Sequence, residues 1–191
     1  ARLSAKFSEN LLDATNAFSV YVEKSQTAGI PDDVLQAARE DAQKDGKAGW
    51  KFTLHMPSYL PVMQYADDRL LREKMYYASS TRASEFGNPQ WDNAPLIASI
   101  VPLRHELAQL LGYRNFAEVS LVPKMAESSS QVIAFLDDLA RRARPFAEKD
   151  VAELREFARN ELNLPDLQAW DVAYASEKLR LKRYSFSDQE V

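Results

Sequence analysis

The stretch that decides the fold is Ser129–Leu162, SSQVIAFLDDLARRARPFAEKDVAELREFARNEL. Its apolar residues return every three or four positions, which is the spacing of one face of an α-helix. These positions are Val132, Leu136, Leu139, Ala143, Ala147, Val151, Leu154, Ala158 and Leu162. The pattern predicts one long amphipathic helix, begun by a capping box at Ser128 and Gln131 and bent at Pro145.

Similar helical spacing recurs through most of the remaining sequence. It predicts helices over residues 4–27, 31–44, 58–65 and 170–184, and further helices that begin at Asp67 or Asp68, at Asn93 and at Asn115. Pro102 should kink the helix that follows Asn93 or break it near Ser99, and Gly112 should end it in a left-handed conformation. The stretch WKFTL, residues 50–54, alternates apolar and polar side chains and is the one predicted strand. The expected class is therefore all-α with one short β element.

No repeat or low-complexity linker divides the chain, so we expect residues 1–191 to form a single helical region. Three parts are expected within it: helices in 1–48, a strand and short helices in 50–126, and the long and final helices in 128–184. The sequence starts at Ala1 without a methionine, and the residues near Val191 resemble the first turn of another helix. We interpret both ends as cut from a longer polypeptide.

The composition excludes several classes of function. Twenty-four basic and twenty-eight acidic residues give a net charge of −4, whereas proteins that coat nucleic acid are usually basic. With no cysteine, the chain cannot form disulfides, thiolate metal sites or cysteine nucleophiles. No apolar run approaches the roughly 18 residues of a membrane span. We therefore expect no nucleic-acid or membrane partner, and a cytoplasmic location with an organelle as the alternative.

The segment His105-Glu106-Leu107-Ala108-Gln109 differs by one residue from the zinc-protease motif H-E-x-x-H. In that motif the two histidines lie one helical turn apart and bind one zinc ion, but position 109 is an amide. The only other histidine, His55, could complete a site only together with an acid such as Glu85. The favoured interpretation is that Arg104, His105 and Glu106 form the polar face of a helix. The apolar face of that helix would carry Leu103, Leu107, Leu110 and Leu111.

Other kinds of active site have no complete pattern in the sequence. There is no G-x-S-x-G nucleophile elbow and no glycine-rich phosphate loop. Six aromatic residues could line a groove, but a small aromatic core between the strand and two helices is the favoured interpretation. They are Trp50, Phe52, Tyr59, Tyr65, Tyr76 and Tyr77.

An ordered series of sequence blocks resembles the thimet oligopeptidase (M3) family of zinc metallopeptidases. The blocks are KFTLHMPSYLPVMQY at 51–65, LREKMY at 71–76, TRAS at 81–84, RHELAQLLGY at 104–113, KMA at 124–126 and AWDVAY at 169–174. The resemblance covers essentially the whole chain. It implies the elongated, non-catalytic helical portion of a two-lobed zincin-type oligopeptidase that hydrolyses short peptides in an internal channel.

The resemblance also implies where the chemistry lies. In this family a true H-E-x-x-H and a later glutamate hold the zinc, and both would follow residue 191. No catalytic or metal residue is therefore carried over to this chain, and its substrate-binding residues are unknown. The implied partners are short peptides and a missing C-terminal catalytic domain that binds the zinc, so the fragment should bind no zinc and be inactive alone. The alternative is a stand-alone, non-catalytic helical binding or scaffold module.

Overall fold

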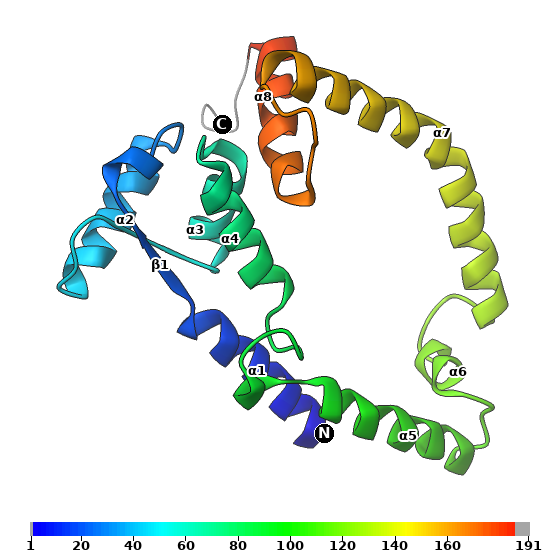
Figure 1. The fold of residues 1–191 in the computed structure, drawn as a ribbon. Coiled ribbons are helices and arrows are strands. Elements are labelled where there is room, and N and C mark those ends of the chain that lie inside the picture. Colours follow the sequence, from blue (N-terminus) through cyan, green and yellow to red (C-terminus); the bar gives the residue numbers. More distant parts are fainter. Residues whose placement is uncertain (1, 186–191) are drawn as a thin grey trace. The chain divides into compact units, whose positions relative to one another are not determined.

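The computed structural model describes residues 2–185, and this part of the chain is mainly helical (Figure 1). It contains eight α-helices and a single pair of short strands, which confirms the expected class. The chain forms two compact units. The first unit comprises Ala1–Ser8 and Asn93–Ala152, and the second comprises Glu9–Asp92 and Glu153–Val191. None of the described helices is long and apolar enough to cross a membrane.

The second unit is built around a two-stranded antiparallel sheet, β1 (Ser19–Val22) and β2 (Trp50–Thr53). The prediction of β2 is confirmed, but the prediction that the first helix continues to Thr27 is wrong, because α1 (Arg2–Ala17) ends before β1. Val20 lies opposite Phe52 in the ladder, and both are buried. A strand cannot satisfy its backbone groups alone, so pairing with β2 overrides the local helical spacing of residues 18–22.

Helices cover this sheet and complete the main core. They are α2 (Asp32–Lys44), α3 (Met56–Tyr65) and α4 (Arg69–Ser80). Asp68 caps α4, since its carboxylate accepts hydrogen bonds from the backbone N–H groups of Leu70 and Leu71 at 2.9 and 3.2 Å. Phe52, Val62 and Met75 are fully buried in this core. The Asp68 cap of α4 is therefore as the sequence predicts.

The final helix packs against this body. A short 3₁₀ turn, η3 (Ala169–Asp171), leads into α8 (Val172–Tyr184), close to the predicted range of 170–184. One face of α8 contacts α3, and Tyr65 of α3 donates a hydrogen bond to the buried Glu177 at 3.3 Å. A second small core joins the end of α7 to α8 through Leu154, Ala158 and Ala175.

The first unit consists of α5 (Ala94–Leu110), α6 (Phe116–Leu121) and most of α7 (Ser129–Glu161), together with the start of α1. Helix α5 continues through Pro102, so the predicted alternative of a break near Ser99 is wrong. Proline removes one helical hydrogen bond, but the carbonyl it leaves belongs to the exposed Ala98, where water can bind it. Helix α7 likewise runs unbroken through Pro145.

Two turns of the first unit form as local sequence chemistry predicts. Gly112 adopts a φ of 81°, and the next N–H, that of Tyr113, bonds the Ala108 carbonyl at 2.9 Å, which closes the end of α5. Asn115 then caps α6 by accepting a hydrogen bond from the Glu118 N–H at 3.1 Å. These short-range contacts set the path of the chain from α5 into α6.

Candidate functional site

The near-motif at His105–Gln109 lies on α5, where His105, Glu106 and Gln109 are exposed and Ala108 is buried. The Gln109 side-chain amide donates hydrogen bonds to the carbonyl oxygens of Tyr113 and Arg114, at 3.3 and 2.9 Å. It therefore satisfies backbone acceptors just beyond the helix terminus, where no intrahelical donor remains. The predicted apolar face is exposed at Leu103, Leu107 and Leu110.

The described residues do not fit a zinc site. Within residues 2–185, no three histidine, aspartate or glutamate side chains lie close enough together to hold a metal ion. His55 is exposed, and it is the N-cap residue of α3, where its carbonyl accepts hydrogen bonds from Ser58 and Tyr59. That this chain carries no catalytic or metal residue remains a prediction from the resemblance.

The aromatic residues mainly form a core, as the favoured interpretation predicts. Phe52 and Tyr65 are buried, while Trp50, Tyr59 and Tyr76 are partly buried and line the core. The sixth residue, Tyr77, is exposed. It lies with Phe18, Tyr76 and Trp170 around a shallow apolar hollow on the second unit.

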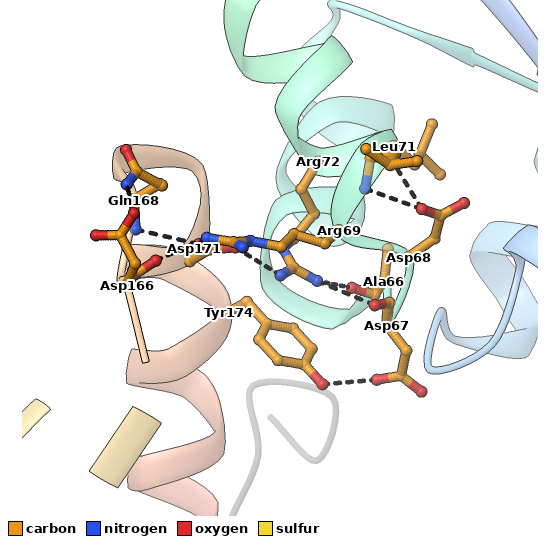
Figure 2. Close-up of polar contacts among 11 residues, drawn as sticks. Ala66, Asp67, Asp68, Arg69, Leu71, Arg72, Asp166, Gln168, Asp171 and Tyr174 are labelled. Atoms are coloured by element: carbon orange, nitrogen blue, oxygen red, sulfur yellow. Dashed lines mark hydrogen bonds and ion pairs between the residues drawn. The ribbon is translucent and has the colours of Figure 1, made fainter. Parts of the chain in front are cut away.

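The most unusual site in the second unit is a buried cluster of charges between α4 and α8, drawn in Figure 2. Asp171 is fully buried and accepts a hydrogen bond from the Arg72 guanidinium at 2.7 Å, where Arg72 itself is 1% exposed. Arg69 approaches the same carboxylate with two nitrogens, at 2.7 and 3.0 Å. The backbone N–H of Gln168 adds a further bond at 3.1 Å. One carboxylate therefore holds two arginines that lie on successive turns of α4.

Other donors of these arginines bond backbone carbonyls, although the buried Nε of Arg72 has no hydrogen-bond partner among the described residues. Arg72 donates to the Ala66 carbonyl at 2.6 Å, and Arg69 donates to the Asp166 carbonyl at 2.7 Å. The Arg72 guanidinium lies 4.1 Å from the centre of the Tyr174 ring, which is within the range of a cation–π contact. The Tyr174 hydroxyl in turn donates to Asp67 at 2.8 Å. Figure 2 shows that the cluster ties η3 and α8 to the start of α4.

The electrostatics of the cluster follow from these contacts. Burial alone would raise the pKa of Asp171, but hydrogen bonds from Arg69 and Arg72 outweigh it and hold that pKa below its ordinary value. Burial and the bond to Asp67 raise the pKa of Tyr174 to about 12. Near neutral pH Asp171 is thus an ionised carboxylate whose oxygens both accept hydrogen bonds, and Tyr174 is a neutral hydrogen-bond donor. Neither group is free to exchange a proton with a substrate, so the cluster is a structural clamp.

Sequence reasoning missed this clamp. Arg72 and Asp171 are 99 positions apart, and each residue taken alone is typical of a solvated helix surface. A signal was nevertheless present, because both residues fall within blocks that carry the family resemblance, LREKMY and AWDVAY. An arginine and an aspartate within such blocks are candidates for a buried pair.

Comparison with known proteins identifies the family. The model of peptidase family M3 matches residues 62–191, which is most of the chain. The chain belongs to peptidase family M3. Oligopeptidase A of Salmonella typhimurium is 48% identical over 194 aligned residues, which cover 100% of this M3 chain and 28% of that relative. The resemblance predicted from the sequence blocks is therefore confirmed.

Two plant relatives align along the whole M3 chain as well. Probable cytosolic oligopeptidase A of Arabidopsis thaliana is 40% identical and is covered over 28% of its length. The organellar oligopeptidase A of the same plant, named as chloroplastic and mitochondrial, is 38% identical and is covered over 25%. The chain thus spans little more than a quarter of the length of these relatives.

Proposed function

We propose that this chain is the non-catalytic helical portion of an oligopeptidase A-like zinc metallopeptidase that hydrolyses short peptides. The observation that carries the proposal is the 48% identity to oligopeptidase A along all of this chain, over 28% of that relative. The zinc, the water that attacks the peptide and the catalytic base would then belong to the remaining polypeptide.

In the intact peptidase this portion would form part of the body and one wall of an internal channel. A narrow channel selects short unfolded peptides by size, because a folded domain cannot enter it. The apolar hollow beside Tyr76, Tyr77 and Trp170 is the described feature best suited to face such a channel. An aromatic surface of this kind can contact many different peptide side chains without strict sequence preference.

The implied partners and location belong to the same proposal. The main partner is the catalytic domain of the same polypeptide, which would carry the zinc, and no nucleic acid or membrane is involved. Relatives named as cytosolic and as organellar both align with this chain, which supports the cytoplasm with an organelle as the alternative.

Two experiments test the proposal. The coding sequence downstream of Val191 should continue in frame and encode an H-E-x-x-H motif, whereas a stop codon there would favour the stand-alone scaffold module. The purified 191-residue chain, stripped of metal and reloaded with zinc, should leave a quenched fluorescent peptide uncleaved. Cleavage that is lost in a His105→Ala variant would instead show that the near-motif is an active site.

A further inference from the structure

The longest helix of the chain has one continuous apolar face that is covered at only one end. From Leu136 to Ala158, the apolar residues of α7 recur every three or four positions and so lie on one side. At the C-terminal end of this face, Leu154 is 9% exposed and Ala158 is fully buried against Ala175 of α8. The fold therefore uses this face as a packing surface.

The N-terminal part of the same face is bare. Leu136 and Phe146 are 55% and 69% exposed, although they resemble in type and spacing the residues that α8 covers. We call this part the bare face of α7; it comprises Ile133, Leu136, Leu139, Ala143, Phe146, Ala147 and Val151. At 1.5 Å per residue it is about 27 Å long. An uncovered apolar strip of this length marks an interaction surface.

The opposite side of α7 is a solvated surface. Asp138, which is partly exposed, forms ion pairs with Arg141 and Arg142, and the exposed Glu148 forms one with Arg144, all within the same helix. The bare face is therefore the side of this part of α7 better suited to burial. Its alternation of large side chains with Ala143 and Ala147 leaves grooves into which the side chains of another helix can fit.

We propose that the bare face of α7 is the packing surface for a helix from the part of the M3 polypeptide that lies outside residues 1–191. This inference rests on the proposed function. Its partner is a segment of the same polypeptide because the relatives carry most of their length outside the matched region. The length of the bare face requires an amphipathic helix of about 18 residues. The covered end of α7 shows that a helix can pack on this face, since α8 already packs there from within the chain.

The absence of cysteine allows a direct test by thiol labelling. Ala143→Cys places a thiol on the bare face, and Ala134→Cys is the matched control. The two positions are nine residues apart, which is two and a half turns at about 3.6 residues per turn, so they lie on opposite sides of α7. Both alanines are exposed, and each variant adds only one sulfur atom. Maleimide labelling would be followed by peptide mapping in the 191-residue chain and in the longer protein.

In the 191-residue chain both thiols should react at similar rates. In the longer protein the thiol at position 143 should react at least ten-fold more slowly, while the thiol at position 134 should keep its rate. Equal reactivity of both thiols in the longer protein overturns the inference. Protection of position 143 in the 191-residue chain, together with a doubled mass in sedimentation, also overturns it, because the partner is then a second copy.

A label-free measurement guards against a variant that disturbs packing. Hydroxyl-radical oxidation of the unsubstituted Phe146 should be strong in the 191-residue chain and weak in the longer protein. Peptide hydrolysis by the longer protein separates the two proposals. If the longer protein hydrolyses peptides but its position 143 is reactive, the proposed helix packing on α7 is refuted and the proposed function is not. If position 143 is protected but no hydrolysis occurs, the proposed function is refuted and the helix packing is not.

Discussion

Replacing Asp171 by asparagine should strongly destabilise the second unit. The substitution keeps the shape of the side chain but removes the charge that neutralises Arg72, which is 1% exposed. Removing one member of a buried ion pair typically costs about 3–5 kcal/mol, because the remaining charge stays buried without compensation. Folded domains have a total stability of about 5–15 kcal/mol. At about 2–4 °C per kcal/mol for a chain of this size, the melting temperature should fall by roughly 6–20 °C.

Tryptophan fluorescence during urea unfolding is a suitable assay, since Trp50, Trp91 and Trp170 all belong to the second unit. The matched control is Asp41→Asn, the same chemical change in the exposed pair of Asp41 with Lys44. Surface pairs of this kind contribute less than about 1 kcal/mol. A midpoint for Asp171→Asn no lower than that of the control would refute the argument that the clamp is a buried ion pair.

The same reasoning predicts a partial rescue and a pH dependence. The double variant Arg72→Met with Asp171→Leu should recover much of the lost stability, because apolar side chains can replace a buried pair. The pKa of Asp171 is lowered in the folded chain. Its contribution to the free energy of unfolding is therefore present above the ordinary carboxyl pKa and is lost as the pH falls through the lowered pKa of the folded chain. Stability of the Asp171→Asn variant should accordingly depend less on acid pH.

Three further predictions concern single side chains. Because the pKa of Tyr174 is raised to about 12, its contribution to the free energy of unfolding should be present below the ordinary value of 10.0 and lost as the pH rises through about 12. The urea midpoint of Tyr174→Phe should therefore fall less steeply above pH 10 than that of the unsubstituted chain. Asp68→Ala should cost about 1 kcal/mol in urea unfolding through loss of the α4 cap, and Asp68→Asn should restore most of it. Gln109→Ala should cost about 1 kcal/mol or less by circular dichroism, because its bonds to Tyr113 and Arg114 lie in solvent; a larger loss would show a deeper role.

The parts of the fold that depend on neighbouring residues could be predicted from the sequence. The Asn115 cap, the Gly112 turn and the length of α7 each follow from residues a few positions apart. Strand β1 could not be recognised in this way, because what makes it a strand is its pairing with β2, thirty residues later. A lone predicted strand nevertheless implies a partner, and that argument would have directed attention to the alternating burial of Val20 and Val22.

The candidate site was harder to predict than the fold. The near-motif at His105 attracts attention because it is local, yet its glutamine stabilises a helix terminus. The clamp consists of residues that meet across about a hundred positions, so no window of sequence contains it. The bare face of α7 was visible as a periodic pattern, but only the structure shows which end of it the chain itself covers.

The clamp also bears on the order in which the chain can fold during its synthesis. Arg72 is translated 99 residues before Asp171, and the whole of α5, α6 and α7 lies between them. At about 5–20 residues per second, the ribosome needs roughly 5–20 s to cover that interval. Residues of the first unit can therefore fold while the arginines of α4 are still hydrated and not yet paired with Asp171. The buried charge of Arg72 is then first neutralised when η3 is synthesised, so the AWDVAY block sets the earliest time at which the clamp can form.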